Sequence, residues 1–345
     1  MPQMSELSLQ RSKLSTWLFA VSIALFQFDC QAQDAPTLKP QVQLINADVK
    51  DQDDMCIWLA PDDPSRSTII TSDKSANSLF VYDLEGKLLQ KISLPKPGNI
   101  DLRQAVKLDG KSFDIVVVNQ RTAGFKLCVF SVDAKTRELQ RLDDDTLLTG
   151  HNYGGCLYQS RSSQRLYFIC TSDQGVVEQY ELMRHQQGGI RHAKVREWPL
   201  GKCESAVAAD DTGDLYISEE AKGIWKLGAE PTDATPGELI IKVGQHGFKG
   251  DVEGLAIDGQ RIVVSDQGRS RFMIFERSAP YSYLGEFAIE GVNDTDGLDL
   301  ITSNLGPHFP HGLFACHTDR APRPVMLTPW HEITSRLPKL VATPK

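Results

Sequence analysis

An aromatic residue recurs about every 49 residues through most of this chain, and this repeat constrains the fold more than any other feature. The aromatic residues are Tyr82, Phe130, Tyr180, Trp225 and Phe275, with intervals of 48, 50, 45 and 50 residues. Each lies in a short β-branched or aromatic run that follows another such run. Similarity at a fixed period of this size is typical of chains that copy one supersecondary unit.

A second series supports the same period. A polar or acidic residue precedes the first apolar run of each unit, at Asp54, Asp101, Tyr153, Glu204, Glu253 and Asp296, with spacings of 47, 52, 51, 49 and 43 residues. Six starts at nearly constant spacing predict an all-β fold, a six-bladed β-propeller with four strands in each blade. The alternative is a large β-sandwich in which the spacing is a coincidence.

The expected strands are short runs bounded by Gly, Asp, Asn and Pro. In five units the second strands are expected at 67–71, 113–119, 165–170, 214–218 and 261–265, and the third strands at 78–84, 126–132, 176–182, 223–227 and 271–276. A sixth unit is expected to continue at 324–327. Residues 41–49 precede the first unit, and we expect them to supply the outer strand of the last blade. Such pairing removes an exposed sheet edge.

The first 32 residues have the pattern of a secretory signal peptide. Arg11 and Lys13 precede an apolar run at 14–28, and Cys30 and Ala32 give a cleavage site of small residues. The alternative is a single N-terminal anchor, but the run is short for a membrane span. We therefore expect one propeller domain at 33–345, located in the periplasm or secreted, with no membrane association after the signal is removed, and acting as a monomer.

Removal of the signal would leave six cysteines, an even number that permits disulfides in an exported protein. Cys156 and Cys170 lie symmetrically about a turn near Ser163, so they are plausible cross-strand neighbours. The sequence leaves open whether they form a disulfide or two packed thiols. The cysteine spacings do not match a zinc site.

The formal net charge is −8, so the chain lacks the general basic footprint of a nucleic-acid-binding protein. In a propeller, however, the first strands line the central shaft and the second strands return to the same face. Ten carboxylates are expected around this face: Asp53, Asp54, Asp101, Glu204, Glu220, Asp251, Glu253, Asp294, Asp296 and Asp299. Crowded carboxylates repel one another, and Ca²⁺ relieves this because it accepts six to eight oxygen ligands in loose geometry. Individually, pairs such as Asp-Gly are also common turn formers.

Basic residues accompany these acids. Lys74, Arg103 and Arg121 are expected at strand ends of the first two units. A cation site flanked by Lys and Arg suits a phosphate group, which Arg can bind through two hydrogen bonds. The alternative is surface ion pairing with nearby Asp residues. No GxSxG elbow or Walker loop is present.

Several ordered motifs resemble those of the β-propeller phytases, over roughly residues 45–335. They include D-Q-D-D-M-C-I-W at 51–58, G-N-I-D-L-R at 98–103, L-Y-I-S-E-E at 215–220, D-V-E-G-L at 251–255 and D-T-D-G-L-D at 294–299. The resemblance implies a calcium-dependent phosphomonoesterase, a 3-phytase, that hydrolyses myo-inositol hexakisphosphate (phytate). It implies that bound calcium ions activate a water molecule and that the substrate arrives as a calcium complex.

The resemblance also implies roles for particular residues. It suggests Lys74 and Arg121 as phosphate contacts, and Tyr153, Glu204, Asp251, Glu253 and Asp296 as active-site calcium ligands. Asp53, Asp54, Glu220 and Asp294 are further candidate ligands for several calcium ions.

One position departs from the family pattern. Between Thr171 and Gly175 the family usually carries a phosphate-binding Lys, whereas this chain has Ser172, Asp173 and Gln174. An Asp there repels an anion unless it gains a metal. Two alternatives follow: a propeller lactonase or phosphotriesterase, which would not need Lys74 and Arg121 for a neutral substrate, and a non-catalytic propeller that binds phytate.

Overall fold

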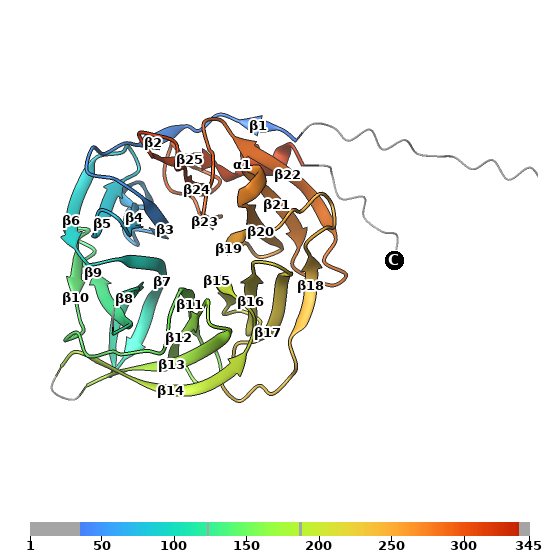
Figure 1. Cartoon of the computed structure of the whole chain (residues 1–345). Coiled ribbons are helices and arrows are strands. Elements are labelled where there is room, and N and C mark those ends of the chain that lie inside the picture. Colours follow the sequence, from blue (N-terminus) through green and yellow to red (C-terminus); the bar gives the residue numbers. More distant parts are fainter. Residues whose placement is uncertain (1–34, 123, 186–187, 338–345) are drawn as a thin grey trace, which may run out of the picture. The chain divides into compact units, whose positions relative to one another are not determined.

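The structure is a computed structural model that describes residues 35–122, 124–185 and 188–337. These residues form six sheets around one axis (Figure 1). The predicted six-bladed β-propeller is therefore confirmed, and the sandwich alternative is wrong. The expected signal peptide lies outside the described residues. Among the described residues, no helix has both the length and the apolar character needed to cross a membrane.

Each blade has its first strand at the axis and its fourth strand at the outside. Blades 1 to 3 contain β3 (Gln52–Trp58), β4 (Thr68–Asp73), β5 (Ser78–Asp83) and β6 (Leu88–Ser93); β7 (Pro97–Leu108), β8 (Lys111–Gln120), β9 (Lys126–Val132) and β10 (Leu139–Arg141); and β11 (Gly154–Gln159), β12 (Leu166–Thr171), β13 (Val176–Arg184) and β14 (Ile190–Pro199). Blades 4 to 6 contain β15 (Cys203–Ala209), β16 (Asp214–Glu219), β17 (Gly223–Gly228) and β18 (Glu238–Lys242); β19 (Val252–Ile257), β20 (Arg261–Asp266), β21 (Arg271–Glu276) and β22 (Tyr283–Ile289); and β23 (Leu298–Ile301), β24 (Leu313–His317) and β25 (Val325–Pro329).

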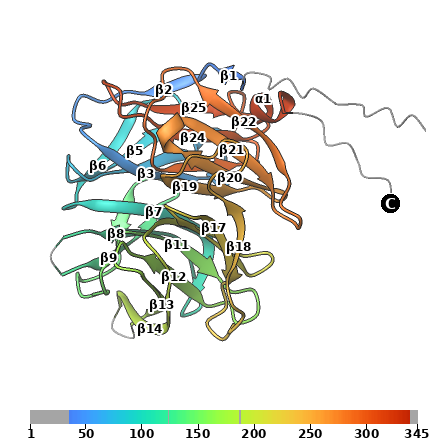
Figure 2. The same ribbon diagram turned by 45° about the vertical axis from the view of Figure 1, so that its right-hand side comes forward.

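The N-terminal segment closes the ring, as predicted. Strand β2 (Val42–Leu44) pairs antiparallel with β25 as the fourth strand of blade 6, with Val42 opposite Leu327. Strand β1 (Thr37–Leu38), which was not expected, adds a parallel fifth strand to blade 5 beside β22. Figures 1 and 2 show both short strands along the outer edges of these blades. The two ends of the propeller domain are thus tied together by backbone hydrogen bonds.

The core consists of six apolar layers, one between each pair of neighbouring blades. Between blades 5 and 6, for example, Phe272 and Phe287 pack against Phe314, with ring centroids 4.9 and 5.2 Å apart. Because a blade packs against neighbours on both faces, its inner strands are buried throughout, as in β3 and β4. Burying one Phe or Leu side chain contributes roughly 1.5–3 kcal/mol, so the repeated layers stabilise the ring.

The described residues also contain three short helices: η1 (Pro64–Arg66) and η2 (Gln267–Arg269), which lie between strands, and α1 (Trp330–Ser335), which follows β25. Trp330 opens α1 and is 3% exposed against the layer between blades 5 and 6. Its indole nitrogen donates a hydrogen bond to Asp258 Oδ2 at 3.3 Å. This contact anchors the end of the described chain on blade 5.

The cysteines in the described residues are free and buried. Cys156 pairs with Ile169 in the β11–β12 ladder, whereas Cys170 pairs with Gly155. Adjacent positions on a strand face opposite sides, so Cys156 packs between blades 3 and 4 and Cys170 between blades 2 and 3. Neither a disulfide nor a packed pair of thiols is formed.

Candidate functional site

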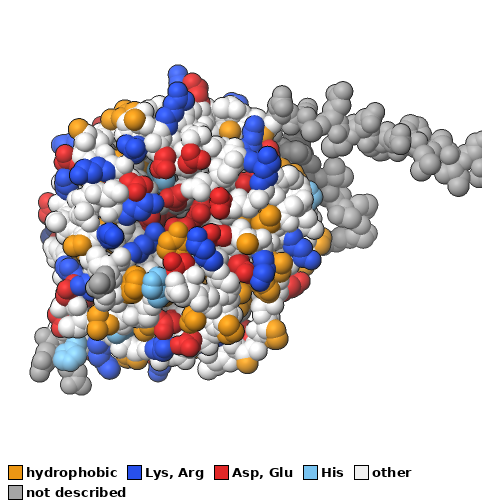
Figure 3. All heavy atoms as spheres, in the orientation of Figure 1, with side chains coloured by type: hydrophobic (Ala, Val, Ile, Leu, Met, Phe, Trp, Pro, Cys, Tyr) orange, Lys and Arg blue, Asp and Glu red, His pale blue; other side chains and the backbone are white. Residues whose placement is uncertain are grey.

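The site lies at the end of the axis where the first strands begin and the second strands end. Figure 3 shows acidic side chains gathered at the centre of this face, with Lys and Arg side chains around them. Glu204 lies at the start of β15, Glu253 at the start of β19, and Glu220 directly after β16. This is the convergence that the propeller geometry predicted.

Irregular strand pairing aims these carboxylates at the axis. The ladder shifts register between Cys203 and Ala206 in blade 4, and between Val252 and Leu255 in blade 5. The same shift occurs between Gln52 and Met55 in blade 1, where Asp53 and Asp54 lie. Bulges of this kind leave residues unpaired and redirect their side chains. The acidic residues at the strand starts therefore turn inward rather than alternate regularly.

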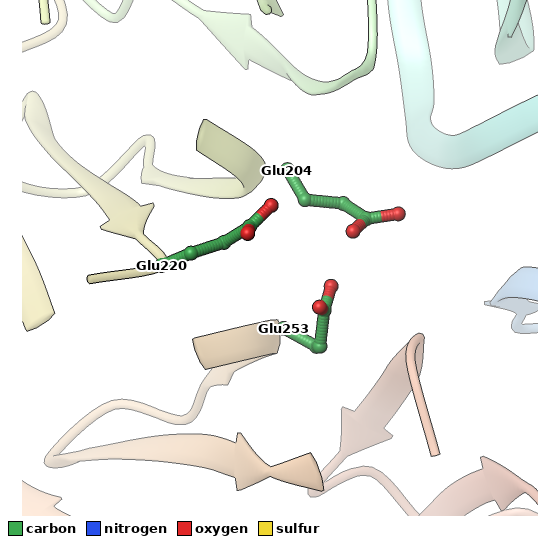
Figure 4. Close-up of side chains that lie close together, drawn as sticks. All are labelled: Glu204, Glu220 and Glu253. Atoms are coloured by element: carbon green, nitrogen blue, oxygen red, sulfur yellow. The ribbon is translucent and has the colours of Figure 1, made fainter. Parts of the chain in front are cut away.

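Glu204, Glu220 and Glu253 form the acid trio. One ligand oxygen from each lies within 4.8 Å of the others, and Figure 4 shows the three carboxylates directed toward a common space. Glu204 and Glu253 are only 7% and 6% exposed. Two buried oxygens of the trio, Glu220 Oε1 and Glu253 Oε2, have no hydrogen-bond partner. Unpaired buried carboxylate oxygens are costly unless a cation meets them.

The electrostatics of the trio point the same way. Burial, together with a hydrogen bond and charge repulsion from Glu204, raises the pKa of Glu253 far above its ordinary value. Burial also raises the pKa of Glu220, although Lys202 opposes this effect and Glu204 adds to it. The donor set is entirely oxygen, which fits a hard cation such as Ca²⁺ or Mg²⁺ better than zinc or iron.

Lys74 and Arg121 occupy the neighbouring side of the face, after β4 and β8. Lys74 Nζ lies 3.2 Å from Asp53 Oδ1 and 3.2 Å from Asp296 Oδ2. Arg121 donates to both oxygens of Asp53 and, from Nη2, to Glu204 Oε1 at 3.2 Å. The structure thus brings together the two predicted phosphate contacts and three predicted ligands.

The Tyr153 ring contacts two cations of the site, Arg121 and Lys202. Its ring centroid is 4.5 Å from Arg121 Cζ and 5.3 Å from Lys202 Nζ. Burial and the charge of Glu204 raise the pKa of the Tyr153 hydroxyl. The phenol therefore stays protonated at neutral pH and can donate a hydrogen bond to an oxyanion.

Asp296 is held from several directions. Its Oδ1 accepts a hydrogen bond from Gln267, and its backbone N–H donates to His317 Nε2 at 3.1 Å. His317 is fully buried. The sequence analysis did not single out His317, the last residue of β24, or Gln267, which directly follows β20. Their positions at the ends of β24 and β20 are the signal that marks them as neighbours of Asp296.

Of the remaining predicted ligands, two are exposed on the face outside the trio, and one is buried near the shaft. Asp251 is exposed but close enough to Glu220 to raise its pKa. Asp294 is exposed, and its carboxylate accepts a hydrogen bond from Asn293 Nδ2 at 2.5 Å. Asp54 is buried at the mouth of the shaft, where its Oδ2 accepts a hydrogen bond from the Ile100 N–H at 3.1 Å. The structure therefore does not bring all nine candidate ligands into one cluster.

Three charged residues expected on this face lie inside the shaft instead, which contains a cavity of about 520 Å³. Arg103 pairs with Asp101 and with Asp210, which follows the far end of β15, so for Arg103 the structure shows ion pairing with nearby Asp residues, the alternative left open by the sequence, although inside the shaft rather than on the surface. Asp299 also lines the cavity. Strand β7 is twelve residues long and begins at Pro97, four residues before Asp101. Asp101, Arg103 and Asp299 face the axis, as expected, but they lie deeper in the shaft than the sequence analysis placed them.

Lys202 was missed by the sequence analysis. Its Nζ lies 2.8 Å from Glu220 Oε2, on the blade 3 and blade 4 side of the trio. It precedes Glu204 by two residues, just before β15 begins. That position relative to a predicted strand start is the signal by which it could have been found.

Comparison with known proteins gives a consistent picture. The model of the family described as phytase matches residues 15–322. A 3-phytase from Bacillus subtilis (strain 168) is 34% identical over 279 residues, covering 76% of this chain and 73% of that relative.

Solved structures of similar shape are more distant. Kuenenia stuttgartiensis hydrazine synthase has a TM-score of 0.46 at 9% identity, covering 87% of this chain and 98% of that one. Saccharomyces cerevisiae Sqt1 has a TM-score of 0.42 at 10% identity, covering 76% and 70%.

Proposed function

Because the chain belongs to the phytase family and is an enzyme that hydrolyses phytate, we propose that it does so with calcium ions bound at the acid trio. The observation that carries this proposal is the trio itself, with ligand oxygens within 4.8 Å and two buried oxygens unpaired. Glu204, Glu220 and Glu253 would hold the central ion. Asp53, Asp54, Tyr153, Asp251, Asp294 and Asp296 remain candidate ligands for this or further ions.

A bound divalent cation supplies charge neutralisation, polarisation of a phosphoryl oxygen and a water molecule that ionises more easily. The side chains around the trio supply positioning. Lys74 and Arg121 bind substrate phosphates, and Asp53 and Asp296 hold these two cations in place. Tyr153, whose ring contacts Arg121 and Lys202, can donate a hydrogen bond from its hydroxyl group to a substrate oxygen. Chemistry of this kind needs no covalent nucleophile from the chain.

The net charge of the protein favours a metal-bound form during substrate binding. Phytate is a dense polyanion, and the chain carries a formal charge of −8. Without cations the acidic centre of the face repels this substrate, whereas bound calcium reverses the local sign. We therefore propose that the substrate is a calcium complex of phytate.

We also propose that residues 1–32 direct export and that residues 33–345 act in the periplasm or outside the cell as a monomer. The charged start, the apolar run at 14–28 and the small residues that follow support export. Pairing of β2 with β25 supports the monomer, because the ring is complete without a second copy.

The test of the calcium proposal is phosphate release from phytate by the chelated protein, with Ca²⁺, Mg²⁺ or Zn²⁺ added back singly. We expect activity to disappear with chelator and to return best with Ca²⁺. Glu253→Gln should lose most of the calcium-dependent activity, whereas Glu290→Gln, an exposed carboxylate after β22, should retain it. Full activity in excess chelator would overturn the proposal.

A further inference from the structure

The chain before blade 4 runs beside the loop that follows β12 in blade 3. The Leu200 N–H donates to Gly175 O at 3.1 Å, and the Cys203 N–H donates to Ser172 O at 3.0 Å. These two bonds fix Lys202 next to the loop at 172–174. The side chains of Lys202 and of residues 172–174 can therefore reach the same space.

Lys202 places a positive charge at the edge of the acid trio. Its Nζ lies 2.8 Å from Glu220 Oε2 and 5.3 Å from the ring centroid of Tyr153. A lysine ammonium group is positively charged at neutral pH. Its side chain is 51% exposed, compared with 31% for Lys74 and 14% for Arg121. Of these three cations, Lys202 is the most accessible from solvent.

The loop beside it provides no positive charge of its own. Asp173 Oδ1 lies 2.8 Å from His151 Nδ1 and accepts a hydrogen bond from Gln174 Nε2 at 3.1 Å. The Asp173 carboxylate thus contacts Gln174 in its own loop and His151 in the loop that precedes β11. Lys74 and Arg121 follow strands of blades 1 and 2, whereas Lys202 contacts the trio from the side of blades 3 and 4.

We propose that Lys202 binds a substrate phosphate on this side of the trio, opposite the group bound by Lys74 and Arg121. The inference rests on the proposed function, since it assumes that phytate lies over the trio. Phytate carries phosphates around a ring, so cations on two sides of the trio can hold one substrate molecule. Lys202 forms an ion pair with a single carboxylate, Glu220. Once a metal ion binds to the trio, the negative charge of Glu220 is shared between that ion and Lys202. The ammonium group can then turn to a phosphate.

Lys202→Met tests this role, because methionine keeps much of the side-chain volume and removes the charge. We expect the KM for phytate to rise roughly three- to tenfold at low salt, with kcat nearly unchanged, since a partly exposed charge contact makes a moderate contribution. Added salt should reduce this difference, because it screens an exposed charge. Lys202→Arg should remain close to the wild type.

Lys222→Met is the matched control. Lys222 also pairs with a glutamate, Glu219, at 2.9 Å, lies over an aromatic ring, Trp225, and has a side chain 56% exposed. Its partner is outside the trio. We expect this variant to keep the wild-type KM, which separates loss of phosphate binding from loss of a surface ion pair.

Moving the charge across the blade boundary provides a second test. Asp173→Lys introduced into the Lys202→Met variant should restore much of the lost affinity, because position 173 borders the same space. An aryl monophosphate has no second phosphate, so its KM should change less in Lys202→Met than that of phytate. An unchanged phytate KM in Lys202→Met, with a fully active wild type, would overturn the inference alone. A wild type that releases no phosphate would overturn the proposed function as well.

Discussion

Arg121 binds Asp53 through two parallel hydrogen bonds, Nη1 to Oδ1 at 3.2 Å and Nη2 to Oδ2 at 2.9 Å. The Asp53 side chain is 1% exposed, and its Oδ1 also meets Lys74 Nζ at 3.2 Å. One buried carboxylate therefore fixes both proposed phosphate-binding cations. A metal ion bound to Asp53 would compete with Lys74 and Arg121 for its oxygens. Asp53 is therefore better suited to positioning these two side chains, and the trio is better suited to binding a metal ion.

Arg121→Lys should lower kcat/KM for phytate by roughly 10- to 100-fold, because lysine cannot reproduce the two-point contact with Asp53 or with a phosphate. The contact with the Tyr153 ring would weaken as well. Steady-state phosphate release at saturating calcium measures the effect. The thermal midpoint should change little, because the charge is kept.

Arg165→Lys provides the comparison for this substitution. Arg165 pairs with Glu181 at 3.2 Å on blade 3, and its side chain is 60% exposed. Its replacement should leave both kinetic constants at wild-type values. Equal losses in the two variants would argue against a site role for Arg121.

The blade architecture could be predicted because each blade repeats the same pattern of buried strands and turn residues. The predicted strands at 126–132 and 271–276 have the observed bounds of β9 and β21. Register was harder to predict. A turn centred near Ser163 would place Cys156 opposite Cys170, whereas the ladder pairs Cys156 with Ile169. A shift of one residue moves a side chain to the other face of a sheet.

The site was predictable only as far as strand starts and ends define a face. Glu204, Glu220 and Glu253 come together because all three occupy such positions. The depth of Arg103 in the shaft depends on the extra length of β7, which local sequence does not show. Lys202 lies beside Glu220 because the two residues extend the pairing of Cys203 with Glu219 in the β15–β16 ladder, where the Glu220 N–H donates to Lys202 O at 3.1 Å. Residue types alone do not encode such contacts.

The effect of Glu253→Gln on thermal stability should have opposite signs in the calcium-free and the calcium-bound protein. Burial raises the pKa of Glu253, so the folded, metal-free protein holds a proton that the unfolded chain releases above its ordinary pKa near 4.5. Stability therefore falls as pH rises above that value, and a neutral Gln avoids this loss. We expect the metal-free variant to melt above the wild type at pH 7, by about 2–4 °C for each kcal/mol removed.

With saturating calcium the order should invert, because Gln donates no charge to the ion. Thermal melts at pH 4 and pH 7, with chelator and with calcium, test all four conditions. The metal-free difference should nearly vanish at pH 4. A variant less stable than the wild type under every condition would show that Glu253 is needed for the fold itself.

Asp299 provides a pH test inside the shaft. Burial, with repulsion from Asp101, raises the pKa of Asp299 to about 7. The folded chain then keeps a proton between pH 4 and 7 that the unfolded chain has lost, so this carboxyl makes stability fall as pH rises through that range. We expect a contribution of about 1–2 kcal/mol, reduced by water in the shaft.

Asp299→Asn should therefore flatten the decrease in the free energy of unfolding between pH 4 and 7, measured by urea unfolding in chelator. Each Asp299 oxygen accepts one backbone N–H, from Ile57 or from Leu300. Asparagine keeps only one acceptor oxygen, so the variant loses one of these hydrogen bonds and should be less stable overall. Asp62→Asn, at an exposed position, should keep the wild-type slope. A slope unchanged in Asp299→Asn would assign the pH dependence to other groups.

Gly297 connects the packing of blade 6 to the site. A Cβ at this position would collide with Asp54 Oδ1 and lie 2.5 Å from Asp54 Cα and 2.7 Å from Asp53 O. Gly297→Ala must therefore move the backbone that carries Asp53, and with it the anchor of Lys74 and Arg121. We expect a loss of about 1–3 kcal/mol in stability, as for other overpacked positions, and a larger fractional loss of phytate turnover. Gly259→Ala adds a Cβ with no atom within 4 Å and should change neither quantity. Normal turnover in Gly297→Ala would mean that the position of Asp53 does not control the basic pair.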